Sequence, residues 1–408
     1  MPDGTPAVAP APAAGRDASS RVDPVAALTE LGALLRGHGP VTGSPGLASG
    51  AFSLGLAILC LLSVLAYRFP AYLTTPMLRA VYDADALRIV LFVAMVSAGM
   101  VAAFDLVAGR RRVLAAAALA AVAIAAALGG AWVPVDDIPP GTPYIGLDWF
   151  VLDLLASTAL FTLLERLRPL VPDQPVFRED WQTDLGWFAL NHVLVGLVLL
   201  TVNALVHGSV SSLAAPGLQA AIAGLPFWIA LPVCLVAADL AQYWIHRAFH
   251  EVPWLWRFHA IHHSVRTMDW LAGSRLHLLE VVVTRVAVLG PLHVLGFSKS
   301  VMDAYVVIVG LQAVLVHSNL RLRLGVLEWL WATPRWHHWH HASDAIAIDR
   351  NYAVNFPLID RVFGTAILPS DRDMPAAYGL HDEAVPPGLL GQLVHPFARA
   401  AQAHADRP

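Results

Sequence analysis

Residues 227–263 read FWIALPVCLVAADLAQYWIHRAFHEVPWLWRFHAIHH. The first half of this stretch is mostly apolar, and it is long enough to cross the roughly 30 Å hydrocarbon core of a bilayer as a helix. The second half carries histidines at helical spacings: His246, His250, His259, His262 and His263. A membrane helix that leads directly into closely spaced imidazoles predicts a metal site at the membrane face.

The composition of the whole chain agrees with a membrane location. Of its 408 residues, 57% are hydrophobic and only 14% are charged, which is not the composition of a soluble protein. Lys299 is the only lysine and the net charge is -4, so nothing indicates a nucleic-acid surface. Cys60 and Cys234 lie in apolar stretches and offer no thiolate pair. Any metal must therefore be held by histidine or carboxylate.

Hydropathy predicts an all-α integral membrane protein, a multi-pass transmembrane helical bundle with a histidine-rich helical cap. Segments with the length and composition of spans are 51–66, 87–107, 113–133, 149–164, 185–206 and 227–245. Two further apolar segments, 278–297 and 302–316, are separated by a short polar stretch and predict a helical hairpin. Arg285, Pro291 and His293 interrupt its first arm, so hydropathy leaves open whether the hairpin crosses the bilayer or only enters it.

The two ends of the chain differ from its middle. Residues 1–50 are rich in Pro and Ala without an apolar period, and we expect them to form a disordered tail. N-terminal transmembrane helices are expected over 51–140. From Arg321 onward the chain has no long apolar run and is expected to form the cap. Its last part, 371–408, is expected to be a C-terminal tail that frays after about His395.

The loops between the spans predict an orientation. Basic residues favour the cytoplasmic side, and they cluster in the loops after the second and fourth spans: Arg110, Arg111, Arg112, Arg166, Arg168 and Arg178. The loops around 136–137 and 209–226 carry none. Six spans then return the chain to the cytoplasm at His246, which predicts a cytoplasmic histidine site. The loop after the first span fits less well, because Arg68 and Arg79 fall on the exterior side.

Twelve of the 18 histidines lie between His246 and His341. Besides the five already named, they include a cluster at His337, His338, His340 and His341, and the two single candidates His277 and His317. One ion accepts about four to six ligands, so eight to ten convergent imidazoles imply two ions. The isolated His192, His207 and His293 are interpreted as hydrogen-bonded structural residues.

Acidic residues near the clusters are candidates for an outer set of contacts. A ligating imidazole normally donates its second N–H to a carboxylate or a carbonyl oxygen. Asp239 lies in the sixth predicted span, where an unpaired carboxylate would be costly. Asp344, Asp349 and Asp360 follow the last histidine cluster and could serve in the same way.

These motifs resemble the fatty acid hydroxylase superfamily, also called the sterol desaturase family, of integral-membrane di-iron proteins. The resemblance rests on the order of motifs from Asp239 to His250, Trp256 to Ser264 and Thr333 to His341, and it covers roughly residues 145–370. The segment from Asn351 to Thr365 is similar to the closing signature of the family and adds Asn351 to the outer set. Ala353, where many members carry glycine, and the additional His338 depart from the pattern without removing a ligand.

The resemblance implies a catalytic domain over 145–370 and a ligand set for two iron ions, with zinc as a substitute in purified protein. The implied metal ligands are His246, His250, His259, His262, His263, His277, His317, His337, His340 and His341. No catalytic residue beyond these ligands is predicted. The implied reaction is an attack on a C–H bond of a lipid, which uses O2 and gives hydroxylation or desaturation. The implied location is a bacterial cytoplasmic membrane.

The sequence also bears on partners and on alternatives. No dinucleotide-binding fingerprint or Cys-x-x-Cys pair is present, so electrons are expected from an external donor of the ferredoxin, rubredoxin or cytochrome type. The lipid substrate is expected to come from the bilayer. A zinc-dependent membrane hydrolase is one alternative, although the chain has no His-Glu-x-x-His motif. A non-catalytic metal-binding or transport protein is another, although its polar residues should lie at mid-membrane.

Overall fold

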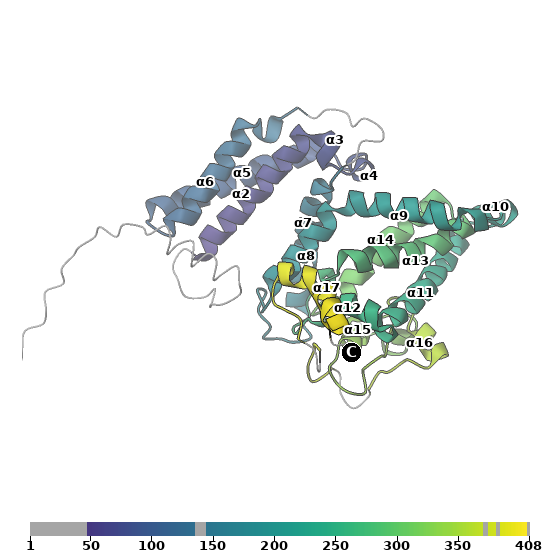
Figure 1. Ribbon diagram of the computed structural model, residues 1–408. Coiled ribbons are helices and arrows are strands. Elements are labelled where there is room, and N and C mark those ends of the chain that lie inside the picture. Colours follow the sequence, from purple (N-terminus) through teal and green to yellow (C-terminus); the bar gives the residue numbers. More distant parts are fainter. Residues whose placement is uncertain (1–46, 135–143, 370–373, 381–383, 406–408) are drawn as a thin grey trace, which may run out of the picture.

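The computed structural model describes residues 47–134, 144–369, 374–380 and 384–405 (Figure 1). In these residues the chain is helical and the only β pairing is two isolated bridges, so the predicted all-α class is confirmed. Eight helices are long and apolar enough to cross a membrane, and both arms of the predicted hairpin are among them. The predicted N-terminal tail lies outside the described residues up to residue 46, and a helix begins at Leu47.

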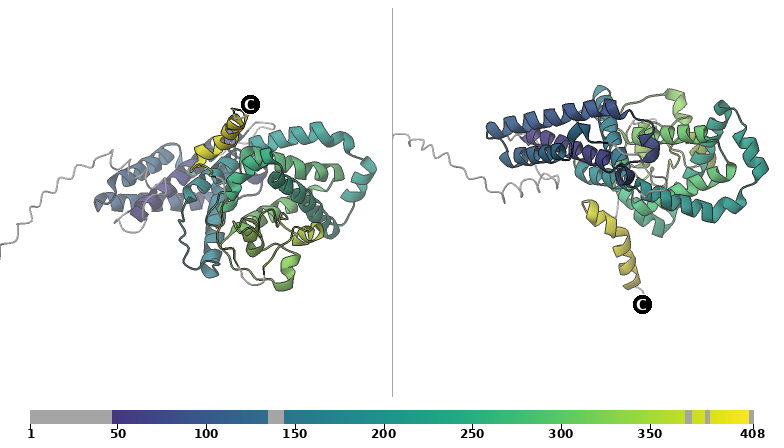
Figure 2. Two further views of the ribbon diagram at one scale, coloured as in Figure 1. Left: turned by 60° about the horizontal axis from the view of Figure 1, so that its bottom comes forward. Right: turned by 90° about the horizontal axis from the view of Figure 1, so that it is seen from above.

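Three long helices form an N-terminal unit. They are α2 (Leu47–Arg68), α5 (Ala84–Val107) and α6 (Arg112–Ala127), with the short α3 (Pro70–Leu73) and α4 (Pro76–Arg79) between the first two. Small side chains let the three helices approach closely: Ala57, Ala98, Ala102, Ala118 and Ala121 are buried together. The unit extends to one side of the remaining helices in both views of Figure 2.

The remaining helices surround the histidine-bearing segments. The long ones are α7 (Leu147–Leu167), α8 (Trp181–Val193), α9 (Val195–Val210), α11 (Phe227–Glu251), α13 (Leu278–Leu295) and α14 (Lys299–His317). The helix α10 (Pro216–Ala223) precedes α11. Three short helices, α12 (Pro253–His263), α15 (Pro334–His340) and α16 (Pro357–Phe363), lie at one end of the bundle in Figure 1. Because α11 and α14 both end in this region, their last residues meet α12 and α15 there.

The predicted span 185–206 is wrong in one respect, because the helix breaks at Leu194 into α8 and α9. Polar contacts hold the end of α8 in place. Asn191 Nδ2 donates to the carbonyl oxygens of Ser274 and Leu276, and a ring nitrogen of His192 lies 2.7 Å from a carboxylate oxygen of Asp153. The apolar sequence of residues 185–206 does not indicate this break, because the partners that hold the end of α8 lie far away along the chain. The span proper therefore begins at Val195.

The predicted frayed C-terminal end is also wrong, because Leu389–Ala405 form the helix α17. This helix contacts α8 and α12. Trp187 Nε1 donates to Gln392 Oε1 at 2.7 Å, and the ring of Phe397 packs on those of Phe258 and His277. These contacts give a segment of low hydropathy a fixed position beside the histidines.

A close approach at the start of α9 yields a test of this fold. A Cβ atom at Gly196 would lie 2.3 Å from the carbonyl oxygen of Tyr144, whereas one at Gly208, on the same helix, would meet nothing within 4 Å. We expect Gly196→Ala to lower stability by roughly 1–3 kcal/mol through overpacking. We expect Gly208→Ala to raise it by roughly 0.5–1 kcal/mol through helix propensity.

The apparent Tm of the purified variants in one detergent measures both effects. A decrease for Gly196→Ala together with an unchanged or higher value for Gly208→Ala agrees with the packing of α9 on Tyr144. Equal shifts for the two variants would contradict it.

Candidate metal centre

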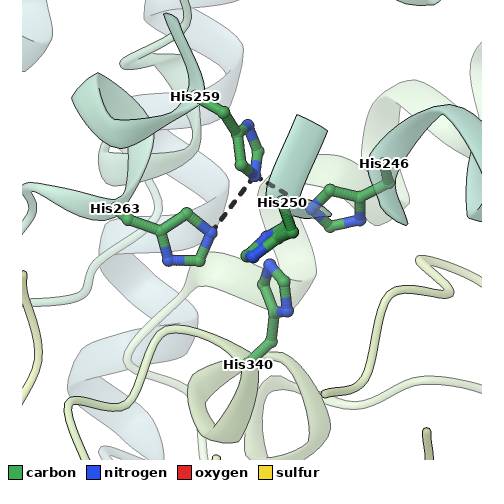
Figure 3. A group of neighbouring side chains, drawn as sticks. All are labelled: His246, His250, His259, His263 and His340. Atoms are coloured by element: carbon green, nitrogen blue, oxygen red, sulfur yellow. Dashed lines mark hydrogen bonds between the residues drawn. The ribbon is translucent and has the colours of Figure 1, made fainter. Parts of the chain in front are cut away.

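The histidines form two buried groups, and each could hold a metal ion. The first group is His246, His250, His259, His263 and His340, and the second is His262, His317, His337 and His341. Within each group one nitrogen from every imidazole lies within 4.8 Å of all the others. Figure 3 shows the five rings of the first group turned toward a common centre. The structure therefore brings together nine of the ten predicted ligands.

Four helices supply the imidazoles, and two of them serve both groups. On α12 the i, i+4 pair His259 and His263 belongs to the first group, while His262 belongs to the second. In and just after α15 the arrangement is reversed, since His337 and His341 belong to the second group and His340 to the first. The histidine clusters of α12 and α15 are therefore each divided between the two groups, whereas His246 and His250 of α11 both belong to the first.

Imidazole rings of the first group stack on imidazole rings of the second. His263 of the first group stacks on His341 of the second, with centroids 4.4 Å apart and an interplanar angle of 24°. His340 stacks on His337 at 5.1 Å and the same angle. Neighbouring rings from both groups are thus in van der Waals contact, and two ions bound here would be close neighbours.

In the first group, outer hydrogen bonds determine which nitrogen carries the proton. His246 Nδ1 donates to the carbonyl oxygen of Tyr352 at 2.6 Å, and His340 Nδ1 donates to that of Arg350 at 2.7 Å. His259 Nδ1 lies 2.7 Å from the carboxylate of Glu280. A carbonyl oxygen only accepts, so Nδ1 of His246 and His340 holds a proton, and Nδ1 of His259 holds one when Glu280 is ionised; each of these neutral rings then has a bare lone pair at Nε2. These lone pairs point inward.

The inward lone pairs face one another across short distances. His246 Nε2 lies 3.1 Å from His259 Nε2, and neither atom has a proton to give in this tautomer. In the second group His262 and His317 donate Nδ1 protons to the carbonyl oxygens of Arg275 and Ala313, and their Nε2 atoms lie 3.2 Å apart. Such pairs repel unless a cation lies between them. The donor set therefore fits bound metal ions.

The distances and the charge state agree with this fit. Two nitrogens bound to one ion at about 2.1 Å, with an angle of about 90° to 110°, are about 3.0 to 3.4 Å apart. His250 Nε2 and His340 Nε2 are buried without a hydrogen-bond partner. Burial holds the pKa well below the usual value in the ligands outside the spans, which are His259, His262, His263, His337, His340 and His341. These imidazoles are therefore neutral, as metal binding requires.

His277, the tenth predicted ligand, belongs to neither group. Its Nδ1 accepts from the backbone N–H of Leu279, and its Nε2 donates to the carbonyl oxygen of Leu393 in α17. The additional His338 is buried beside the second group. It accepts from the hydroxyl of Tyr378 and donates to the carbonyl oxygen of His317. Both residues join the C-terminal part of the chain to the histidine region.

The side chains of the predicted outer residues form hydrogen bonds mainly with backbone groups of other residues. Asp239 accepts from the N–H groups of Asn355 and Phe356, and Asp360 accepts from those of Tyr352 and Ala353. Together they fix the loop whose carbonyl oxygen at Tyr352 receives the His246 proton. Asn351 binds Trp336 and Ile367, and Asp344 accepts from the N–H of Ala376.

Two other carboxylates contact ligands directly. Asp349 lies 3.3 Å from His250 Nδ1, in agreement with the expectation for that residue. Glu280 receives the His259 proton and was missed by the sequence reasoning. It is 4% exposed and lies on the first turn of the apolar helix α13. A lone acid in a membrane span is costly without a partner, and that signal could have identified it.

A buried ion network supports the second group. Arg178 Nη2 lies 2.6 Å from both Asp184 and Asp269, and Arg275 Nε donates to Asp184 at 2.5 Å. The backbone of Arg275 in turn accepts the proton of His262. The pKa of Arg178 is raised by its two carboxylate neighbours against the opposing effect of burial. Charge pairing inside the protein thus fixes a carbonyl oxygen that orients a ligand.

Comparison with known proteins extends this description. A family model for fatty acid hydroxylase matches residues 231–365. Ornithine lipid hydroxylase OlsE of Rhizobium tropici is 30% identical over 261 residues, which are 62% of this chain and 76% of that protein. A putative methylsterol monooxygenase of Dictyostelium discoideum is 25% identical over 202 residues, or 47% of this chain and 71% of that protein.

Human alkylglycerol monooxygenase is 30% identical over 145 residues, which are 36% of this chain and 32% of that protein. The chain thus spans about a third of the length of that relative. No solved structure shows a significant match.

Eight apolar helices among the described residues are long enough to cross a membrane, and two groups of imidazoles converge beside them. Together these features define a multi-pass membrane metalloprotein. The chain belongs to the fatty acid hydroxylase family. It is an oxidoreductase of the lipid hydroxylase and monooxygenase class that its relatives represent.

The carboxylate of Glu280 yields a test of the site. In Glu280→Gln the side chain keeps its size and still accepts from His259 Nδ1, but it loses the charge that makes the imidazole a stronger ligand. We expect metal affinity to fall about 10- to 100-fold. Competition with a chelator, followed by elemental analysis of the purified protein, measures the change.

The matched control is Glu328→Gln, since Glu328 is also buried but binds the backbone N–H of Leu324 and the side chain of Arg335. It should retain metal as the unchanged protein does. Equal metal loss in the two variants would count against the role of Glu280. So would the absence of metal loss from both.

Proposed function

We propose that this chain is a di-iron oxygenase that hydroxylates a C–H bond of a membrane lipid, using O2 and electrons from an external donor. The observation that carries the proposal is the pair of abutting groups of five and four neutral imidazoles with their lone pairs turned inward. A catalytic zinc site keeps three protein ligands and an open position, so this set is too large for one such ion. Two neighbouring ions account for all nine nitrogens.

The nature of the ligands favours iron. Imidazole suits iron as well as zinc and copper, and the relatives of this chain carry names of oxygen-using enzymes. Bound iron would supply the activation of O2 and the attack on the C–H bond. Within the proposal His246, His250, His259, His263 and His340 hold one ion, and His262, His317, His337 and His341 hold the other.

The protein itself supplies orientation and the exclusion of water. Eight of the nine ligands are almost completely buried, and Glu280, Tyr352, Arg275 and Ala313 hold the Nδ1 protons of their partners in fixed positions. The imidazoles lie at the ends of the spans α11 and α14 and on the short helices beside them. We propose that a lipid chain enters this region from the bilayer while its polar head stays at the surface.

Hydroxylation of an acyl lipid with a polar head is the reaction and substrate class that we propose. The ornithine lipid hydroxylase is matched over 76% of its length, whereas the human alkylglycerol monooxygenase is matched over 32%. These relatives are named as hydroxylases and monooxygenases, which favours oxygen insertion over desaturation. We assign the catalytic domain to residues 145–370.

The location is part of the proposal. We propose that the histidine groups face the cytoplasm, and the arginines after the second and fourth spans support this orientation by the positive-inside rule. We propose a bacterial cytoplasmic membrane, in keeping with the relative from Rhizobium tropici. An external donor of the ferredoxin, rubredoxin or cytochrome type can deliver electrons at that face.

Comparative lipid mass spectrometry of cells with and without the chain tests the proposal. We expect one lipid class to gain the mass of one oxygen atom when the chain is present. His262→Ala should abolish this product, because it removes one of four ligands of the second group. His207→Ala should leave product formation within about twofold, since His207 is exposed and interacts with Ser211 and His293 instead.

Each protein must be present in the membrane in similar amounts for this comparison. A loss of two hydrogens in place of a gain of oxygen would show desaturation and contradict the proposed reaction. Unchanged product with His262→Ala would contradict the proposed site.

A further inference from the structure

One face of α11 shows how deep each turn of this helix lies in the membrane. Its apolar side chains are at least 40% exposed and recur every three or four residues: Ile229, Val233, Val236, Leu240 and Trp244. Such a stripe on a membrane-spanning helix contacts lipid. It rises about 22 Å along the helix, and the charged Arg247 follows it on the same face. Trp244 therefore lies where the acyl chains meet the headgroups, at the histidine end of the span.

The helix α16 packs on the chain at this depth. The ring of Phe363 lies 5.0 Å from the ring of Trp244 and stacks at the same distance on that of Tyr243. Figure 1 shows α16 beside the end of α11. On its outer side α16 exposes Leu358 and, one turn later, Val362, which is 71% exposed. These two side chains continue the lipid-facing surface of α11 away from the span.

The segment after α14 also returns to the level of a span. Gln312 is buried within α14, where its Nε2 donates to the carbonyl oxygen of Ala332 and its Oε1 accepts from Trp331 Nε1. The 3-10 helix η4 (Gly325–Trp329) comes just before these residues and contacts α16. Three large apolar side chains are exposed in and beside η4: Val326, Leu327 and Leu330. The side chain at Val326 is 82% exposed, the same as if nothing of the protein covered it.

One arginine lies within this apolar surface. Arg361 precedes Val362 on α16, and its guanidinium carbon is 5.0 Å from the ring centre of Trp329 in η4. Within the part of the chain that the structure describes, Arg361 forms no ion pair. The neighbouring Asp360 is buried and already accepts from two backbone N–H groups. A long basic side chain in this position can keep its stem among acyl chains and its charge among phosphates.

We propose that η4 and α16 lie in the lipid leaflet at the histidine end of the spans, with their exposed apolar side chains among the acyl chains and Arg361 at the phosphates of phospholipids. The lipid-facing stripe of α11 runs directly into this surface, so the same leaflet covers both. An apolar surface of this kind is costly in water. Neither segment is long enough to span a membrane, which is why hydropathy assigned both to the cap.

This surface is joined to the metal centre through α16. Asp360 of α16 accepts from the backbone N–H of Tyr352, and the carbonyl oxygen of Tyr352 receives the proton of His246. The leaflet therefore supports a helix that holds a loop next to the metal centre. The proposal goes beyond the proposed function and does not depend on which reaction the centre performs.

Spin labels at single cysteines test the proposal in the full-length protein. Cys60→Ala and Cys234→Ala first remove the two native thiols, which are both buried. The protein is placed in vesicles of phosphatidylethanolamine and phosphatidylglycerol, and collisions of each label with O2 and with a water-soluble nickel chelate give its depth. We expect labels at Val326→Cys and Val362→Cys to lie about 5–10 Å below the phosphates. A label at Arg361→Cys should lie nearer to the phosphates than the one at Val362→Cys.

Two positions on the exposed face of α11 calibrate the depth. A label at Val236→Cys should lie deep in the hydrocarbon, and one at Glu251→Cys, two turns beyond Trp244, should lie in water. If the labels on η4 and α16 meet the nickel chelate as often as the Glu251→Cys label does, the surface faces water and the proposal is wrong. Protection of these labels from both O2 and the nickel chelate would also overturn it, because protein such as a second copy of the chain would then cover the surface.

Discussion

The repulsion between buried imidazole lone pairs is the constraint on which the rest of this structure depends. His246 and His259, and likewise His262 and His317, face each other through Nε2 atoms that have no proton in the tautomers fixed by their outer contacts. The other nitrogens nearest to them are also imidazole nitrogens, with His263 Nε2 at 3.2 Å from His259 and His337 Nε2 at 3.0 Å from His317. Cations at the two centres turn this repulsion into coordination, so folding of the histidine region and metal binding are coupled.

The outer contacts follow from the same constraint. Each Nδ1 partner must be held rigidly, and the chain uses buried charges for this purpose. Asp239 and Asp360 hold the loop around Tyr352, the ion network of Arg178 and Asp184 holds Arg275, and Glu280 reaches His259 from α13. Glu280 thus connects a span to a short helix and Asp239 connects a span to the loop around Tyr352, and these contacts explain why acidic residues are tolerated in so apolar a chain.

The sequence predicted the spans and the histidine clusters because both are local patterns. It could not predict how the clusters divide, since whether His262 turns toward His259 or His317 depends on how α12 sits against α14. The position of His277 depends on α17, and the break at Leu194 depends on partners near Ser274. Glu280 was missed because its partner is 21 residues away in the sequence, although its cost inside a span was a usable signal.

The central claim is that the two imidazole groups hold two iron ions that use oxygen, and metal analysis of the purified chain combined with an oxygen-uptake assay tests it most directly. The account predicts two iron ions per chain and oxygen uptake that requires both a reductant and membrane lipid. One tightly held zinc ion per chain, with no reductant-dependent oxygen uptake after loading with iron, would contradict it.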